Sequence, residues 1–250
     1  MRFLRSVLIA VLVSVLLPSS LFAQTKTIGA GLDTMVLVPA GEFIMGSNQD
    51  SDEMPQRRVY LDAFYIDKYP VTNSRFRRFG EPAENQGSQF NGDRQSVVGV
   101  TWYQARDYCK SVEKRLPTEA EWEKATRGVD GRKYPWGTRW DGSKVIWREN
   151  SGIKTHRVDR TYNTHRSPFG AVDMVGNTWE WVQDWYGTEY YRNAPNRNPK
   201  GPASGSGRVL RGGSWLIVAD SRFFRAAYRF WFDPGTRSYD FSFRCAKASK

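Results

Sequence analysis

The sequence predicts a single α+β domain with little regular secondary structure. Its 250 residues include 10 tryptophans and 22 glycines, and aromatic side chains make up 14% of the chain. Long amphipathic helical runs are few. Such a composition suits a compact domain in which irregular segments pack around large aromatic anchors. Neither a linker nor an internal repeat is visible, so we expect one domain.

The N-terminal residues read as an export signal. Arg2 and Arg5 form a short basic region, the apolar run 7–17 is too short to span a bilayer comfortably, and residues 21–23 offer a small-residue cleavage site before Gln24. An uncleaved N-terminal anchor is the alternative. We expect residues 1–23 to be a signal peptide and the protein to be exported, to the periplasm or the extracellular space.

A flexible lead-in and the domain itself are expected after the signal. Residues 24–34 are polar and contain glycine, so we assign them to the lead-in, and residues 35–250 to the domain. No second long apolar run follows, so we expect no transmembrane segment in the mature chain. The absence of cysteine near residue 23 argues against a lipid-anchored lipoprotein.

Short strands are predicted in the first third of the domain. Residues 35–46 predict two strands separated by a break at residues 39–41. Residues 57–67 alternate well enough to predict one further strand. A helix is expected to start near Asn73, after residues 70–72.

Two longer helices are predicted next. Apolar side chains recur at helical spacing over residues 102–112. A second helix should run from Glu119 to about Arg127, because Thr118 and Glu121 form a capping box that satisfies the first free backbone amides. The segments rich in Gly, Asn, Pro and Ser are expected to be loops: residues 80–96, 128–169 and 192–207.

The chain is strongly basic. Without Arg2 and Arg5, 35 of the 37 basic side chains remain against 26 acidic ones, a net charge of +9. Such a surface favours acidic partners. The charge is spread along the chain and no nucleic-acid-binding motif is present, so we expect a solvated basic surface and no specific nucleic-acid partner.

The two cysteines, Cys109 and Cys245, are far apart in the sequence. Export implies an oxidising compartment, in which such a pair can persist as a disulfide. Two separate buried thiols are the alternative.

Three blocks carry a family resemblance. They are Lys-Arg-Leu-Pro-Thr-Glu-Ala-Glu-Trp-Glu-Lys at 114–124, Val-Gly-Asn-Thr-Trp-Glu-Trp at 175–181 and Arg-Val-Leu-Arg-Gly-Gly-Ser-Trp at 208–215. In this order they resemble the formylglycine-generating-enzyme, or sulfatase-modifying-factor, family, over about residues 35–246. The resemblance implies that family's fold, a variant of the C-type lectin fold. It also implies the Cys109–Cys245 disulfide, because family members pair cysteines at these places.

The resemblance further implies a calcium site. Its expected ligands are the side chain of Asp173, the carbonyls of Gly176 and Thr178, and the side chain of Glu180. Oxygen ligands at alternate positions can wrap a hard cation. The alternative is an aromatic core turn in which Glu180 accepts hydrogen bonds from backbone amides.

The catalytic residues of the family are missing from this chain. A formylglycine-generating enzyme oxidises a substrate cysteine to an aldehyde with a copper-binding cysteine pair that follows the Gly-Gly-Ser block. The matching positions fall near Ile217 and Arg222, so we expect neither copper nor catalytic residues. The only histidines, His156 and His165, lie in a loop-rich stretch, and Ser214 is not in a Gly-x-Ser-x-Gly elbow.

The segment after the Gly-Gly-Ser block is instead dense in aromatic and arginine side chains, the composition of recognition hot spots. It resembles the ligand-displaying ends of variable proteins diversified by retroelements, which share this fold. That resemblance implies a binding face made of eight residues, with an ordinary aromatic core as the alternative: Trp215, Ile217, Asp220, Arg222, Phe223, Tyr228, Trp231 and Tyr239.

The leading prediction is an exported, non-catalytic recognition protein with a calcium-stabilised scaffold and a protein or glycan ligand. One alternative is an oxidoreductase of the formylglycine-generating type that uses a non-standard site. The other is an envelope-associated accessory subunit.

Overall fold

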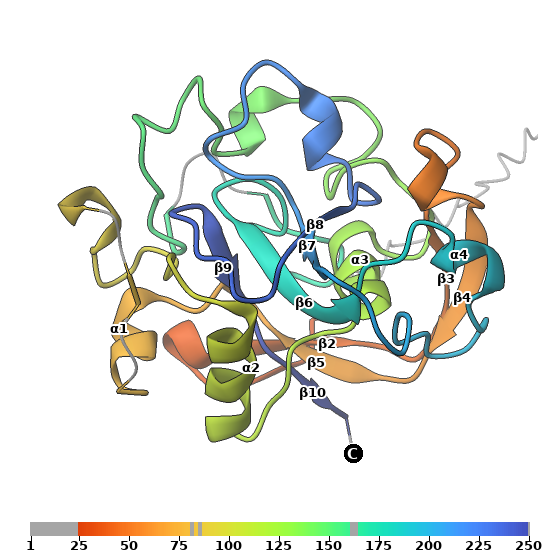
Figure 1. The fold of residues 1–250 in the computed structure, drawn as a ribbon, viewed down its shortest axis with the longest axis horizontal. Helices are drawn as coiled ribbons and strands as arrows, with labels where there is room; N and C mark the ends of the chain where they lie inside the picture. Colours follow the sequence, from red (N-terminus) through yellow and green to blue (C-terminus); the bar gives the residue numbers. More distant parts are fainter. Residues whose placement is uncertain (1–24, 81–82, 85–86, 161–164, 250) are drawn as a thin grey trace, which may run out of the picture.

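The computed structural model describes residues 25–249 apart from 81–82, 85–86 and 161–164. The expected signal peptide, residues 1–23, lies outside the described residues. The described chain forms three small sheets, short helices and long loops, in agreement with the predicted α+β class (Figure 1).

The first sheet joins the two ends of the described chain. Its order is β1 (Thr27–Ile28), β2 (Met35–Val38), β5 (Phe64–Asp67) and β10 (Ala246–Ala248), and all its pairings are antiparallel. Residues 24–34 were expected to be a flexible lead-in. In its described part, residues 25–34, β1 pairs with β2 and a 3₁₀ turn, η1 (Gly31–Asp33), connects them.

The second sheet is a two-stranded ribbon of β3 (Gly41–Met45) and β4 (Arg57–Leu61), at the right of Figure 1. The two strands predicted in residues 35–46 are confirmed as β2 and β3. The single strand predicted over 57–67 is wrong, because the chain leaves β4 at Asp62 and enters the first sheet as β5. The Asp62 amide donates to Asn198 instead of continuing the ladder.

The third sheet carries the C-terminal half. Its order is β8 (Phe230–Phe232), β7 (Arg208–Arg211), β6 (Trp179–Trp185) and β9 (Phe241–Phe243). Strands β6 and β9 are parallel, and the other pairs are antiparallel. Strand β8 lies at an edge of this sheet and β6 in its interior.

The two longest described helices agree with the sequence. Helix α3 (Glu119–Arg127) has the predicted capping box between Thr118 and Glu121. Helix α2 (Trp102–Ser111) has a second capping box, between Thr101 and Gln104, which the same rule could have found. The remaining short helices are α1 (Asn73–Arg77), α4 (Tyr190–Asn193), η2 (Ser51–Glu53), η3 (Ser88–Phe90), η4 (Gly142–Lys144) and η5 (Ser221–Phe224).

Buried side chains form three clusters. The largest lies around α3 and the first two sheets, and includes Trp122 and Phe43. The second lies between α2 and the third sheet, and includes Trp181 and Phe243. The third consists of Phe90, Val98, Ile146 and Trp215. Within the described ranges, no helix combines the length and apolar character needed to cross a membrane.

Candidate functional site

Strand β7 ends in a tight turn at Gly212 and Gly213. Both glycines have positive φ angles, of 102° and 74°. A Cβ at Gly212 would lie 2.8 Å from the Met174 carbonyl oxygen, and one at Gly213 would lie 2.7 Å from the ring of Phe224. Only glycine lets the chain cross here without displacing its neighbours.

Ser214 follows the turn and is fully buried. Its Oγ donates a hydrogen bond of 2.7 Å to Oδ2 of Asp240, and the Ser238 hydroxyl binds the other carboxylate oxygen. Burial raises the pKa of Asp240, while the bonds from Ser238 and Ser214 oppose this rise. These contacts tie the turn to the segment before β9.

The two positions where the family resemblance places a cysteine pair lie in the same loop. Ile217 is half-buried and packs against both of the larger core clusters. Arg222 is exposed, and its Nε lies 2.7 Å from Oδ2 of Asp220. The first position therefore supports the core and the second belongs to a surface ion pair.

An apolar surface lies beside this loop, and we call it the aromatic face. Its rings follow one another: Phe223 and Tyr228 are 4.9 Å apart, and Phe230 and Phe232 are 5.6 Å apart. Buried Trp179 links the two pairs, at 6.1 Å from Tyr228 and 5.1 Å from Phe230. The name covers the linked rings of Phe223, Tyr228, Phe230 and Phe232 together with three apolar side chains of the adjoining loop, Leu216, Ile217 and Val218.

The sequence missed four of these residues. Val218 is 65% exposed and Phe232 is 40% exposed, whereas neither was among the eight predicted ligand-binding residues. Phe230 and Phe232 are two apart on β8, so they point to the same side of the sheet. That strand period was the signal available for Phe230 and Phe232, and nothing comparable marked Leu216 and Val218.

Three of the predicted binding residues lie elsewhere. Trp215 is 2% exposed and forms the third core cluster with Phe90, so it cannot be part of an exposed face. Tyr239 packs on the same cluster. Trp231 is exposed, but it stacks on Tyr186 at 5.6 Å, because it points to the opposite side of β8 from its neighbours. Trp215 therefore belongs to the aromatic core, which was the alternative to a binding face.

A buried ion-pair network supports the aromatic face from beneath. Arg211 of β7 binds Glu123 of α3 at 2.7 Å and Glu119 at 3.3 Å. Its two Nη atoms also donate to the carbonyls of Ala226, Ala227 and Tyr228. Since these carbonyls belong to the segment that leads into β8, the capped helix α3 fixes the position of that strand.

A second arginine strengthens the same connection. Arg229 binds both carboxylate oxygens of Glu119, at 2.8 and 3.0 Å, and donates to the carbonyls of Asp52 and Gly187. Arg225 binds Glu53 in the same two-pronged way. All three arginines are buried, so the contribution of each ion pair to the stability of the fold depends on its geometry.

The predicted calcium ligands do not fit a cation. Both oxygens of Asp173 accept from Arg160, at 2.5 and 2.7 Å. Both oxygens of Glu180 accept from Arg244, at 2.7 Å each, and Oε2 also accepts from the Trp122 indole. Calcium needs six to eight free oxygen ligands, and two adjacent guanidinium groups repel it.

The backbone of the turn gives the same result. The Gly176 carbonyl accepts the Thr178 amide at 2.8 Å. Among the described residues, no group of three or more His, Cys, Asp or Glu side chains is arranged to hold a metal ion. The segment therefore resembles the alternative, a core turn, except that Glu180 accepts from Arg244 and Trp122 side chains rather than from backbone amides.

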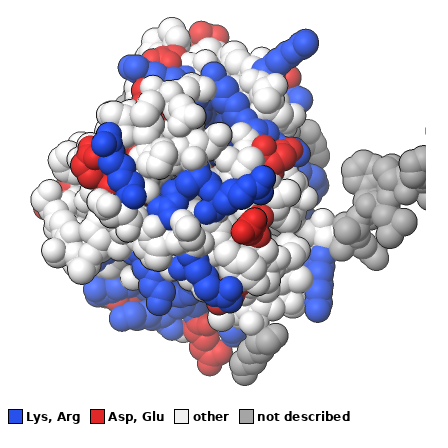
Figure 2. All heavy atoms as spheres, turned by 90° about the vertical axis from the view of Figure 1, so that its right-hand side faces the viewer, with Lys and Arg blue, Asp and Glu red and all other residues white. Residues whose placement is uncertain are grey.

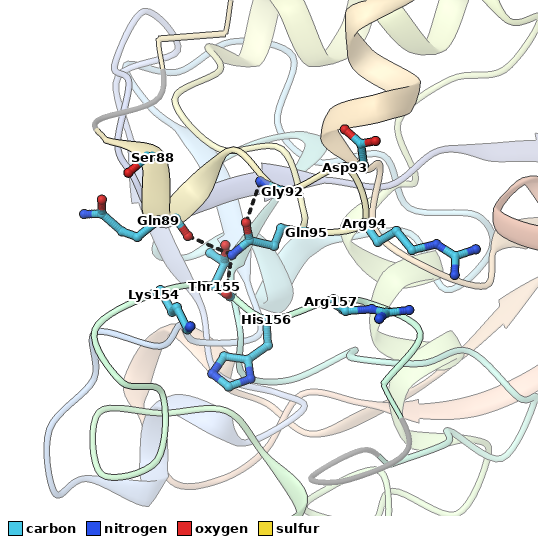
Figure 3. Close-up of a pocket in the computed structure, with 10 residues that line it drawn as sticks. All are labelled: Ser88, Gln89, Gly92, Asp93, Arg94, Gln95, Lys154, Thr155, His156 and Arg157. Carbon is cyan, nitrogen blue, oxygen red and sulfur yellow. Dashed lines mark hydrogen bonds between the residues drawn. The ribbon is translucent and has the colours of Figure 1, made fainter.

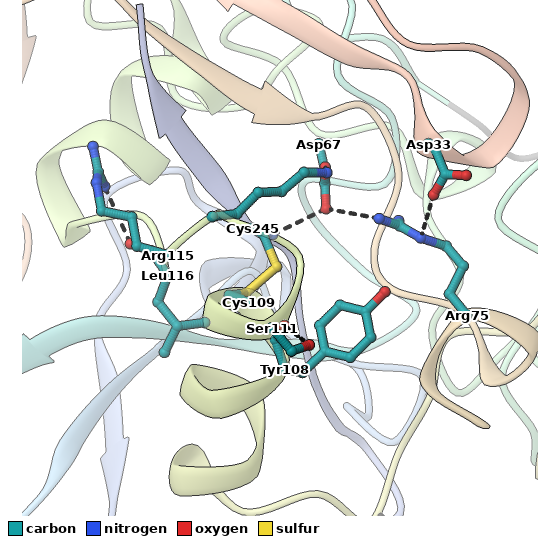
Figure 4. Close-up of a disulfide and its surroundings, with 10 residues drawn as sticks. Asp33, Asp67, Arg75, Tyr108, Cys109, Ser111, Arg115, Leu116 and Cys245 are labelled. Atoms are coloured by element: carbon teal, nitrogen blue, oxygen red, sulfur yellow. Dashed lines mark hydrogen bonds and ion pairs between the residues drawn. A yellow bond between two sulfur atoms is a disulfide. The ribbon is translucent and has the colours of Figure 1, made fainter. Parts of the chain in front are cut away.

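The two cysteines form a disulfide (Figure 4). Cys109 lies in α2 and Cys245 immediately precedes β10, and their Cα atoms are 5.6 Å apart. Beside the bond, Asp67 accepts from the Cys245 amide and from Lys114. Arg75 joins Asp67 to Asp33, as Figure 4 shows. The predicted pairing is confirmed, and it links α2 to the first sheet.

A separate cavity of about 580 Å³ lies between the loop after α1 and residues 154–157 (Figure 3). The Gln95 side chain crosses its floor and binds the backbone of Gly92, Gln89 and Thr155. Asp159 binds two arginines of the wall, Arg94 and Arg157.

Both histidines lie against backbone carbonyls. His156 lines the cavity and its Nε2 lies 2.8 Å from the Ser151 carbonyl, so this nitrogen carries the proton and donates. Burial lowers the pKa of His156 and, more strongly, that of His165, to about 4. Nδ1 of His165 lies 3.2 Å from the Lys144 carbonyl.

Basic side chains cover much of the surface. Figure 2 shows Lys and Arg in a band across the face that carries β3, β4 and α4, with few Asp or Glu between them. Several of these arginines are paired, as Arg197 is with Asp62 and Arg192 with Glu189. The spread of the charge agrees with a solvated basic surface.

A family profile matches almost all of the described chain. Residues 21–249 match the family described as the Sulfatase-modifying factor enzyme 1-like domain. The chain belongs to this family. Among solved structures of the fold, Treponema denticola variable protein 1 is 26% identical, with a TM-score of 0.76 over 90% of this chain and 99% of that one.

PvdO from Pseudomonas aeruginosa is 23% identical with a TM-score of 0.75, over 90% of this chain and 98% of that one, and so shares the fold. Among curated relatives, the formylglycine-generating enzyme of Streptomyces coelicolor is 33% identical over 84% of this chain and 88% of the enzyme. The predicted single sulfatase-modifying-factor domain is confirmed.

The serine/threonine-protein kinase pkn1 of Chlamydia pneumoniae is 36% identical over 86% of this chain. The chain spans only about 38% of the length of that relative. It contains neither the His-Arg-Asp nor the Asp-Phe-Gly triplet of protein kinases.

Proposed function

We propose that this sulfatase-modifying-factor-fold protein is a non-catalytic recognition protein that binds a protein or glycan ligand through the aromatic face. One observation carries the non-catalytic part. The positions of the family's cysteine pair hold Ile217 and Arg222, which neither bind Cu(I) nor exchange disulfides. The only two cysteines of the chain, Cys109 and Cys245, are bonded to each other.

The surroundings of Ser214 support the same proposal. A serine nucleophile must reach the substrate and needs a base in hydrogen-bond contact. Ser214 is fully buried, and its hydroxyl donates to Asp240 beneath the turn. Its role is to hold the loop that carries Leu216 and Val218.

The aromatic face has the features of a recognition surface. Val218, Phe232 and Leu216 are exposed, and the rings of Phe223, Tyr228 and Phe230 are partly buried. Contiguous exposed apolar residues with charged neighbours mark interaction sites. The ion pair of Arg222 and Asp220 supplies the polar rim. A rigid support is present as well, since Arg211 fixes the backbone of Tyr228.

We further propose that the protein acts outside the cytoplasm. The Cys109–Cys245 disulfide supports this location, because such bonds persist in oxidising compartments. The basic and apolar character of the first 17 residues points the same way.

An oxidoreductase of the formylglycine-generating type is the second candidate. It is favoured by the 33% identity to the Streptomyces coelicolor enzyme. Such an activity would need a site other than the family's cysteine pair.

Site-specific photocrosslinking tests the recognition proposal. A photoreactive phenylalanine analogue would replace Val218 in one variant and Val129 in the control, because both are more than half exposed, at 65% and 55%. Val129 lies beside β3, where its carbonyl accepts the Ile44 amide. Both variants would be exposed to the envelope fraction of the producing organism and, separately, to a glycan array.

The proposal predicts a discrete adduct or glycan signal that depends on the aromatic face. The Val218 variant should give the adduct, the Val129 variant should not, and Phe232→Ser should abolish the signal. Identical patterns from both positions, unaffected by Phe232→Ser, would contradict the proposal.

A further inference from the structure

One arginine is held in an unusual way, remote from the ion-pair network. Arg208 is the first residue of β7, and its guanidinium lies between two indole rings. The ring centroids of Trp185 and Trp102 are 3.5 and 3.8 Å from the guanidinium carbon. Trp102 is fixed in turn, because its indole donates to the Val182 carbonyl at 2.7 Å. Stacking on both faces holds the guanidinium in one orientation.

No carboxylate of a described residue lies in salt-bridge contact with Arg208, although the nearby carboxyl group of Asp184 favours its charged form. Nη1 donates to the Gln183 carbonyl at 2.7 Å, while Nε is buried and has no acceptor among the described residues. By contrast, buried Arg211, Arg225 and Arg229 bind glutamate oxygens at 2.7, 2.6 and 2.8 Å. Burial lowers the pKa of Arg208 to about 10, so it stays protonated at neutral pH. A desolvated cation without a counter-ion favours an anion beside it.

Arg208 opens into a cavity of about 760 Å³, which we call the Arg208 pocket. Three further cations line it: Arg115, which is paired with Glu121, Lys110 in the last turn of α2, and Lys200 in the loop before β7. Both lysines are exposed, and neither is in salt-bridge contact with a described carboxylate, although Lys110 lies near enough to Asp107 to help lower its pKa. Three positive charges that no salt bridge holds therefore line one cavity.

The two carboxylates that line the pocket are already neutralised. Both oxygens of Glu121 accept from Arg115, at 2.6 Å each. Asp62 accepts from Arg197 at 2.6 Å and from Asn198 at 2.7 Å. They leave the three cations free to bind an external group.

The remaining walls are apolar. Phe64, Pro199 and Pro202 line the cavity together with the ring of Trp185. A cavity of this size exceeds what an isolated inorganic ion fills, and its apolar walls suit an organic body. A planar guanidinium and two ammonium groups match the several oxygens of a phosphate or sulfate group.

We propose that the Arg208 pocket binds the phosphate or sulfate ester of a small organic molecule. The Arg208 guanidinium and the Lys110 and Lys200 ammonium groups bind the oxyanion. The apolar walls hold the organic body. The site is separate from the aromatic face and does not depend on the proposed function.

Calorimetric titration at fixed ionic strength tests this site. The probes are phenyl phosphate, phenyl sulfate, inorganic phosphate and neutral phenol, added to the full mature protein. Phenyl phosphate or phenyl sulfate should bind saturably, with at least tenfold higher affinity than inorganic phosphate, and phenol should not bind. Equal affinity for inorganic phosphate would overturn the assignment of an organic ligand.

Variants separate the pocket from general charge. Arg208→Gln should lower the affinity at least tenfold, and its thermal transition shows whether it folds. The surface variant Lys110→Ala with Lys200→Ala should lower the affinity severalfold without unfolding, because both lysines are exposed. The exposed control Arg77→Ala, in α1, should bind as the wild type does. No saturable binding, or binding unchanged in both pocket variants, would overturn the proposal.

Discussion

Arg160 and Asp173 form a buried, two-pronged ion pair, with N–O distances of 2.5 and 2.7 Å. Asp173 has a positive φ of 55°, and Asn177, four residues later, has one of 67°. The tight turn that the family resemblance associates with calcium is therefore present. Its negative charge is neutralised by an arginine of the same chain, and that of Glu180 by Arg244.

Metal removal should consequently leave the stability unchanged. Excess chelator should not move the melting temperature of the wild type, and elemental analysis should find no stoichiometric calcium. A chelator-dependent decrease in melting temperature would restore the calcium prediction for Asp173 and Glu180, since removing a ligand that binds only the folded state destabilises it.

Removing Arg160 should be costly. Arg160→Met leaves the buried carboxylate of Asp173 without its partner, and such a loss costs about 3–5 kcal/mol of unfolding free energy. Denaturant titration measures the change. The control is Arg192→Ala, which breaks an exposed pair with Glu189 and should cost at most about 1 kcal/mol. Similar costs for both variants would contradict the assigned role.

The disulfide should be a major source of stability. It joins residues 136 positions apart, and the chain-entropy relation for a loop of this length gives about 5 kcal/mol. The double variant Cys109→Ser, Cys245→Ser should melt well below the wild type, and a reductant should lower only the wild-type transition. Equal melting of the wild type with and without a reductant would contradict a stabilising bond.

Acidification should destabilise the protein partly through His165. Burial lowers its folded-state pKa from 6.5 to about 4. The unfolded chain therefore binds a proton first, and the contribution is fully present above pH 6.5 and is lost as the pH falls toward 4. The shift corresponds to about 3 kcal/mol.

Denaturant titrations at several pH values check this contribution. His165→Gln keeps a donor for the Lys144 carbonyl and removes the titration. The difference between the wild type and the variant should therefore change across pH 4 to 6.5. A constant difference would show that His165 does not titrate as described.

Local sequence signals predicted much of the fold. The capping box of Thr118 and Glu121 gave the start of α3, because the residues that bind are three apart. The disulfide was predicted from the export signal and the family resemblance, because the cysteines lie too far apart in the sequence for any local signal to pair them. Residues 57–67 were misread because alternation continues through Asp62, while the change of sheet depends on its contact with Asn198, far along the chain.

The site depended more on distant contacts. Calcium at Asp173 and Glu180 was predicted from the family resemblance, whereas Arg244, which neutralises Glu180, is 64 positions away. Trp215 and Phe232 are both aromatic, but Trp215 is buried and Phe232 is exposed. The burial of Trp215 depends on its contact with the ring of Phe90, which is distant in the sequence. Patterns in a single sequence do not reveal such contacts between residues that are far apart along the chain.

The non-catalytic character is tested most directly by a turnover assay. Purified mature protein would be mixed with a Cys-x-Pro-x-Arg peptide, copper and oxygen, and mass spectrometry would follow conversion of the thiol to the aldehyde. With Ile217 and Arg222 in place of the cysteine pair, no conversion above a protein-free control is expected. Conversion above that control would contradict the recognition proposal and establish an oxidase with a different site.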